Sequence, residues 1–198
     1  MKTFKYLSMM AFAAIMSFGL TACNNDDDDN GGGGGGSRGK TSVTVNGTTF
    51  SVSYGYWDAI AANDETVMYQ FYAYNNKIEN WKDPIHHVSV IYSSKSTLVT
   101  GLETGSFDSY TVSVGITTAN DSKDIAYYAY AGENGNTGKI KVSKSGNTYT
   151  IEVPSLNYHT FENEAKTFPG TAFSFTGTLA KMPQDVDAKQ FNPQMVGF

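Results

Sequence analysis

Cysteine is almost absent from the 198-residue sequence, in which Cys23 is the only one. No disulfide can form within the chain, so a folded domain has to be held by its hydrophobic core. Helical periodicity is also lacking, because no window beyond the N-terminal stretch repeats apolar residues at i, i+3, i+4 and i+7 over three turns. Helix is therefore expected to be local at most.

Positive charge is scarce as well. Fourteen Lys and Arg stand against nineteen Asp and Glu, which gives a formal net charge of −5 at pH 7. No basic stripe runs along the sequence, and binding to a phosphate backbone depends on such a stripe. Nucleic acid is not expected as a partner.

Catalytic motifs are missing too. The sequence has no Gly-x-Ser-x-Gly elbow and no phosphate-binding glycine loop. His86 and His87 are neighbours in a predicted strand, so they should point to opposite faces and not share a metal ion. His159 lies in a predicted loop beside Glu162 and Glu164, where loop polarity is explanation enough. We expect no enzyme, no metal site and no cofactor.

The N-terminus carries an export signal. Two lysines precede an uncharged apolar stretch from Tyr6 to Leu20, which is shorter than the roughly 20 apolar residues that span a bilayer. The next residues complete Leu20-Thr21-Ala22-Cys23, which resembles the lipobox of bacterial lipoproteins. In that family the cysteine is acylated and becomes the mature N-terminus. The resemblance implies a signal peptide over residues 1–22 and a membrane anchor on Cys23.

Residues 23–40 contain nothing that could form a core. Asparagines and glycines dominate this segment, so a disordered tether is expected. An acidic run follows the cysteine closely and is similar to the signal that sends Bacteroidota lipoproteins to the outer face of the outer membrane. The alternative is a run of charge that is merely solvated. The run consists of Asp26, Asp27, Asp28 and Asp29.

Residues 41–183 have the period-two pattern of strands, and residues 184–198 follow as a C-terminal tail. Asn46-Gly47 predicts the type I′ turn of an opening hairpin. Further strands are predicted over Val67–Tyr74, His87–Tyr92, Tyr110–Thr117, Ile125–Ala131 and Ala172–Leu179, with a hairpin over Lys139–Val153. About eight antiparallel strands make a single all-β domain, either a β-sandwich or an open, lipocalin-like barrel.

The order of short motifs along this domain resembles a loose group of small Bacteroidota surface lipoproteins. The motifs are turn and strand sequences, so the resemblance implies fold and localisation and transfers no activity. They are Val45-Asn46-Gly47-Thr48-Thr49-Phe50, Thr104-Gly105-Ser106-Phe107, Gly138-Lys139-Ile140-Lys141-Val142, Tyr149-Thr150-Ile151 and Phe173-Ser174-Phe175-Thr176-Gly177.

Aromatic residues are the one enriched class, at 14% of the chain with thirteen tyrosines. Most should belong to the core, because each ring buries a large area. The segments 68–74 and 125–130, however, place aromatic residues on both faces of a strand. Either both faces of this sheet are covered, or one of them is a ligand surface.

The best loop candidate for ligand binding is the segment Asn75–Lys82. Trp81 lies there among amide side chains, including Asn76 and Asn80, and an aromatic plane beside planar amides suits a sugar. The alternative is that Trp81 packs under its own loop. Trp57, at the end of a predicted strand, is a similar but weaker candidate.

The expected function is that of a non-enzymatic surface lipoprotein in the outer membrane. It would bind a ligand, such as a glycan, or serve as an accessory protein there. A structural or assembly component of the envelope or of a surface fibre is the alternative, and a hydrolase comes third. The membrane, reached through Cys23, is the first expected partner, and a glycan or an envelope protein is the second.

Overall fold

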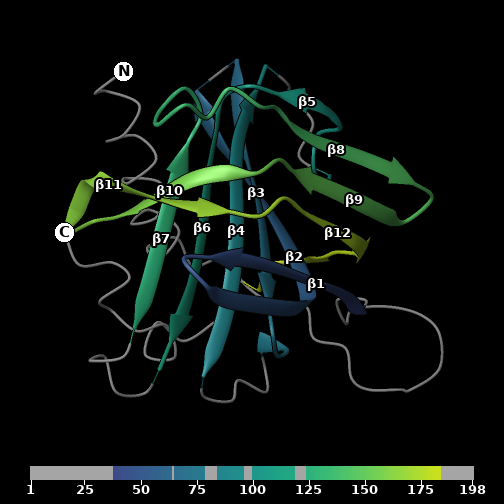
Figure 1. Cartoon of the computed structure of the whole chain (residues 1–198). Coiled ribbons are helices and arrows are strands. Elements are labelled where there is room, and N and C mark those ends of the chain that lie inside the picture. The colour runs from purple at the N-terminus through teal and green to yellow at the C-terminus, as the bar shows by residue number, and fades with distance from the viewer. Residues whose placement is uncertain (1–37, 64, 79–83, 96–99, 119–123, 184–198) are drawn as a thin grey trace. The chain divides into compact units, whose positions relative to one another are not determined.

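The computed structural model describes residues 38–63, 65–78, 84–95, 100–118 and 124–183 (Figure 1). The regular elements in these ranges are thirteen β-strands. No helix among the described residues is long and apolar enough to cross a membrane. The strands are β1 (Arg38–Val45), β2 (Thr48–Asn63), β3 (Thr66–Tyr74), β4 (Ile85–Ser94), β5 (Gly105–Phe107), β6 (Tyr110–Thr117), β7 (Ile125–Tyr130), β8 (Ile140–Ser145), β9 (Thr148–Val153), β10 (Leu156–Thr160), β11 (Asn163–Gly170), β12 (Phe173–Thr178) and β13 (Ala180–Lys181).

Nine of these strands form a large sheet in the order β1-β11-β10-β7-β6-β4-β3-β2-β13. All its ladders are antiparallel except the short one between β13 and β2. The order closes on itself, because β1 pairs with β2 over most of its length and with β11 at Val45 and Gly170. The remaining strands form a small sheet in the order β12-β9-β8-β5.

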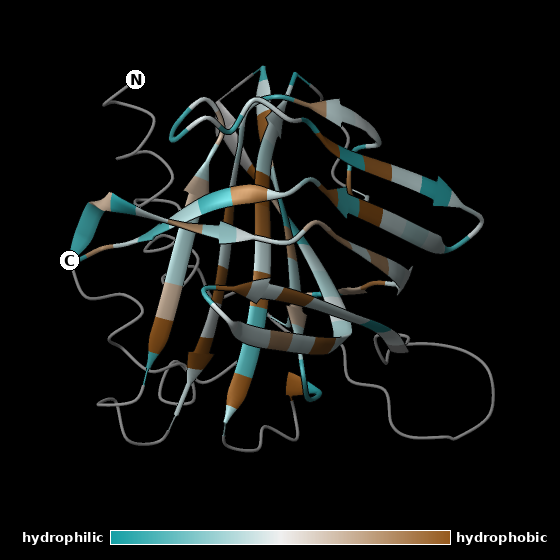
Figure 2. Ribbon diagram, in the orientation of Figure 1, coloured by the Kyte–Doolittle hydropathy of each residue, from teal (hydrophilic) through white to brown (hydrophobic). Residues whose placement is uncertain are grey.

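The core lies between two layers. In Figure 1, β4 runs behind the β1–β2 hairpin, and β8, β9 and β12 lie to the right of β4, β6 and β7. One buried cluster includes Phe71 and Val90 of the large sheet together with Ile140, Ile151 and Phe175 of the small sheet. Figure 2 shows the alternation that produces it, as brown and teal bands along β8 and β9. The all-β prediction is confirmed, and the fold combines packed sheets with a large sheet that closes on itself.

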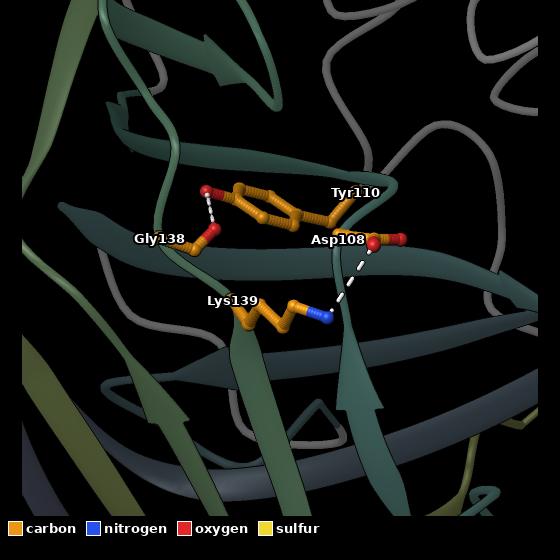
Figure 3. A network of polar contacts seen from close by, with 4 residues as sticks. All are labelled: Asp108, Tyr110, Gly138 and Lys139. Carbon is orange, nitrogen blue, oxygen red and sulfur yellow. Dashed lines mark hydrogen bonds and ion pairs between the residues drawn. The ribbon is translucent and has the colours of Figure 1, made fainter.

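A polar contact fastens the small sheet to the large one. The buried Tyr110 of β6 donates its hydroxyl to the carbonyl oxygen of Gly138, 2.9 Å away, immediately before β8 (Figure 3). Lys139 and Asp108 form an ion pair beside it, with Nζ and Oδ2 3.5 Å apart. Both side chains of that pair are exposed, so the tyrosine contributes more to stability than the ion pair does.

The opening hairpin has the predicted turn. Asn46 and Gly47 both adopt positive φ, at 52° and 78°, as a type I′ turn requires. The hairpin of β10 and β11 was not predicted, and His159, which was expected in a loop, lies in β10. The side chains of β11 from Asn163 to Thr167 are exposed on both faces, so this strand has no period-two pattern.

The second face of the large sheet is buried as well. In β3, Val67, Tyr69, Phe71 and Ala73 belong to the core, so the alternate side chains point to the opposite face, and these are buried too. We call this face the outer layer. It comprises Tyr56 and Asp58 of β2, Met68, Gln70, Tyr72 and Tyr74 of β3, His87, Ser89 and Ile91 of β4, Thr111, Ser113 and Gly115 of β6, Tyr128 and Tyr130 of β7, and His159 of β10.

Candidate functional site

The outer layer differs from the core in composition. The core cluster is hydrophobic apart from tyrosine hydroxyls, whereas buried Gln, His, Ser and Thr side chains lie in the outer layer. Burying polar groups is costly unless they are hydrogen-bonded, so such a layer needs a reason beyond packing. The polar residues of this layer are therefore candidates for a binding role.

Small side chains form a strip along the middle of the layer. The strand register places Ser89 of β4 opposite Ser113 of β6, and their hydroxyl oxygens are 2.7 Å apart. On either side of this pair, in the same cross-strand row, are Tyr72 of β3 and Tyr128 of β7. The middle of the layer is therefore polar and made of small side chains, with a tyrosine on each side.

Gln70 lies at one end of the strip and is fully buried. Its Oε1 accepts a hydrogen bond from the hydroxyl of Tyr72. Its Nε2 has no hydrogen-bond partner within the part of the chain that the structure describes. Turning the amide over would only exchange the two atoms, because the single tyrosine hydroxyl satisfies one of them and leaves the other.

His87 lies at the other end, with 8% of its surface exposed, and its Nδ1 also has no partner among the described residues. Burial, with a smaller effect from the neighbouring His86, lowers the pKa of His87 to about 4. The imidazole is therefore neutral at neutral pH. Its ring lies over Gly115, where a Cβ would collide with Cε1 of His87.

One carboxylate belongs to the outer layer, and it stands at the margin of the sheet. Asp58 of β2 is half-buried and pairs in register with Gln70. Burial raises the pKa of Asp58, while the amide of Ala59 and the charge of Lys181 oppose that rise. The Ala59 N–H donates to Oδ1 of Asp58 over 2.8 Å. The side chains of the strip itself are uncharged, and all of them except Ile91 and Gly115 can form hydrogen bonds.

The opposite margin reaches the surface through aromatic rings. Tyr128 is half-buried and its ring centroid is 4.0 Å from that of Phe161, a residue that is 39% exposed. In the next row, Tyr130 stacks on His159 at 5.3 Å. The layer is thus closed over most of its area and reaches solvent at Asp58 and at Phe161.

The residues that the sequence proposed for ligand binding are distributed differently. Trp57 lies on the core side of β2, packed partly buried against the core, with Nζ of Lys181 5.9 Å from its ring. It does not share a face with its neighbours Tyr56 and Asp58. Asn76 is half-buried just after β3. Trp81, Asn80, Cys23 and the acidic run Asp26, Asp27, Asp28 and Asp29 lie outside the described residues.

The base of the proposed binding loop does meet the outer layer. Asn75 fixes both ends of this loop, since its Nδ2 donates to the carbonyl of Pro84 over 2.8 Å and its Oδ1 accepts the His86 N–H over 3.1 Å. Farther along, the N–H of Ile78 donates to the hydroxyl of Tyr56 over 3.2 Å. The loop that carries the tryptophan therefore starts beside the outer layer.

His86 and His87 point to opposite faces of β4, as their adjacent positions in a strand predict. His87 faces the outer layer, whereas the ring of His86 lies 6.4 Å from Phe50 and its Nδ1 accepts the Ser51 N–H over 3.4 Å. His159 contacts Asn134 and Tyr130. Within the described ranges no three His, Cys, Asp or Glu side chains come together as a set of metal ligands.

Comparisons of the chain with protein-family models, with curated proteins and with solved structures found no match. The geometry of the outer layer and the N-terminal sequence are therefore the features that bear on function.

Proposed function

We propose that the chain is a non-enzymatic lipoprotein of the outer membrane, anchored through Cys23 and facing outward, whose β domain binds a ligand. The lipobox-like Leu20-Thr21-Ala22-Cys23 and the acidic run beside it support the anchoring and the location. A neutral glycan is the proposed class of ligand.

The observation that carries the binding proposal is that the two buried, unpartnered polar atoms of the outer layer, Nε2 of Gln70 and Nδ1 of His87, lie along one strip. A third such atom among the described residues, the hydroxyl oxygen of Tyr158, belongs to the core and not to this layer. Each such atom costs about 1–3 kcal/mol of stability. Apolar side chains of similar volume would fill the same space without that cost. A ligand that supplies hydrogen-bonding groups would satisfy both atoms, and a stability cost of this kind is common at binding sites.

The alternative is a structural or assembly component of the envelope or of a surface fibre. The β10–β11 hairpin favours it, because β11 carries side chains exposed on both faces from Asn163 to Thr167. Such a strand is suited to contacts with another chain, whereas the outer layer is not needed for them.

Ligand binding is tested on the mature lipoprotein in phospholipid nanodiscs, without sugar-based detergents. The melting temperature is measured with a panel of uncharged oligosaccharides. A ligand at about 100 times its Kd adds about 2.7 kcal/mol to the free energy of unfolding, which is a clear shift. If no member of the panel shifts the melting temperature and none binds on a glycan array, the binding proposal is wrong and the structural alternative takes its place.

A further inference from the structure

We infer that the strip between Gln70 and His87 is the ligand site, and that it takes a short, uncharged oligosaccharide lying along β4 and β6. This inference rests on the proposed binding function and adds the place, the charge and the length of the ligand. Two observations support the inference: the unpartnered atoms at the two ends of the strip, Nε2 of Gln70 and Nδ1 of His87, and the strand register of the residues between them.

The groups that line the strip are uncharged. His87 is a neutral imidazole, Gln70 is an amide, and Ser89 and Ser113 share a hydroxyl hydrogen bond. No Lys or Arg belongs to the outer layer, and its carboxylate, Asp58, is at the margin. A buried ion without a partner is strongly unfavourable, so a charged ligand is rejected here. Hydroxyl groups, which both donate and accept, match these side chains.

The spacing of the polar groups indicates an extended ligand. Gln70 of β3 pairs with Ile91 of β4, which lies four residues from His87, with Ser89 midway between them. At about 3.4 Å per residue, the two ends of the strip are about 14 Å apart. A single small solute cannot satisfy Nε2 of Gln70 and Nδ1 of His87 together, whereas an oligosaccharide reaches both.

The sides of the strip suit the apolar faces of sugar rings. Tyr72 and Tyr128 stand on β3 and β7, on either side of the serines. Burial raises the pKa of both hydroxyls, so both tyrosines are neutral. The hydroxyl of Tyr72 donates to Gln70, so its oxygen can accept from a ligand. A tyrosine offers a rigid ring with one polar end, which gives large contact area at small entropic cost.

Entry occurs at the margins where the layer reaches the surface, at Asp58 and at the Tyr128–Phe161 pair. Because most of the strip is buried, binding requires a local opening, so the association rate constant should fall below the roughly 10⁵–10⁷ M⁻¹s⁻¹ that is typical of binding without a conformational change. Slow association is a signature that a loop site exposed to solvent would not give.

Two variants test the site. The double variant Gln70→Met/Tyr72→Phe removes the unpartnered amide together with the hydroxyl that bonds it, so that no new unpaired group is left. The second variant is His87→Leu. Each should raise the Kd for the uncharged oligosaccharide about tenfold or more, which corresponds to the loss of one good hydrogen bond. The control is Thr150→Val on the exposed face of the small sheet, which should leave the Kd unchanged.

A measurement without any substitution accompanies them. Hydrogen exchange of the parent lipoprotein should slow on ligand addition in peptides covering Ile85–Ser94 and Tyr110–Thr117. This readout holds even if a variant fails to fold.

The outcomes separate this inference from the proposed function. If an oligosaccharide binds but both variants keep the parent Kd, or protection appears only outside β4 and β6, the site is wrong and the binding function stands. If anionic oligosaccharides or peptides bind and uncharged oligosaccharides do not, the ligand chemistry is wrong. If nothing binds, both proposals fail.

Discussion

The imidazole of His87 lies against the backbone of Gly115, its register partner on the next strand. A methyl group at position 115 would collide with Cε1 of His87 and come within 2.6 Å of the carbonyl oxygen of Ile125. The glycine is therefore a condition for the position of the histidine, and hence for one end of the proposed site.

The first prediction follows from this contact. Gly115→Ala should lower the free energy of unfolding by about 1–3 kcal/mol, the usual cost of overpacking a filled interior. The loss should be smaller in the background of His87→Ala, because part of the collision is then removed. Urea unfolding of the parent, both single variants and the double variant measures this coupling. Equal losses in the two backgrounds would show that the imidazole does not press on position 115.

Two buried amides give the second prediction. Asn136 is 4% exposed and fully bonded, since its Nδ2 donates to the carbonyls of Tyr130 and Asn157 and its Oδ1 accepts the Asn157 N–H. Gln70 is equally buried and half bonded. Asn136→Leu should cost about 2–4 kcal/mol, because it leaves backbone groups unpaired.

For Gln70→Met/Tyr72→Phe, by contrast, the free energy of unfolding should stay the same or rise by about 1 kcal/mol. Midpoints of urea unfolding at unchanged slope compare the two amides directly. A large loss in this double variant would mean that Gln70 is a structural residue and would weaken the case for a binding role.

The sequence predicted most of the strands, and two of the segments that it missed lack a regular alternation. Tyr110–Thr117 was predicted with its observed ends, because alternating residues are enclosed by turn signals on both sides. The sequence did not predict β11, because its side chains are exposed on both faces and it contains Pro169. The continuation of β2 as far as Asn63 was also missed, because Gly55 and several alanines interrupt its pattern.

The candidate site could not be predicted from the sequence, for a different reason. The aromatic residues on both faces of β3 did indicate a second buried or binding face. That Gln70 and His87 lack partners, however, depends on which residues lie opposite on the neighbouring strands. No local pattern within one strand contains that information.

The third prediction concerns the anchor. Cys23→Ala should abolish incorporation of labelled fatty acid and block the normal cleavage of the signal peptide, because the thiol is the proposed acylation site. Metabolic labelling of cells, followed by gel analysis of the precursor and the mature form, measures both effects. Undiminished label on the variant would contradict the lipoprotein proposal.

The fourth prediction concerns the acidic run. Changing Asp26, Asp27, Asp28 and Asp29 together to Ala should leave the protein lipidated but facing the periplasm. Protease added to intact cells should then no longer digest it, whereas it digests the parent. A variant that is digested as fast as the parent would indicate that these charges only solvate the tether.

The fifth prediction is a pH dependence of stability that originates in His87. Its pKa is about 4 in the folded protein, against 6.5 for a free imidazole. Because the folded pKa is depressed, the folded state binds the proton less well than the unfolded state does. The contribution of neutral His87 is therefore fully present above pH 6.5 and is lost as the pH falls from 6.5 to 4.

The size of this effect follows from the shift, since each pKa unit corresponds to about 1.4 kcal/mol, giving about 3 kcal/mol in all. Burial also lowers the pKa of His86, so that histidine acts in the same direction and is varied separately as His86→Gln.

The free energy of unfolding is measured by urea at a series of pH values for the parent and for His87→Leu. The difference between them should change across the interval from 6.5 to 4 and should be flat above it, because the carboxylates common to both proteins cancel. Parallel curves throughout the interval would show that His87 is solvated in the folded protein, and an exposed imidazole of that kind would have no unpartnered nitrogen to offer a ligand.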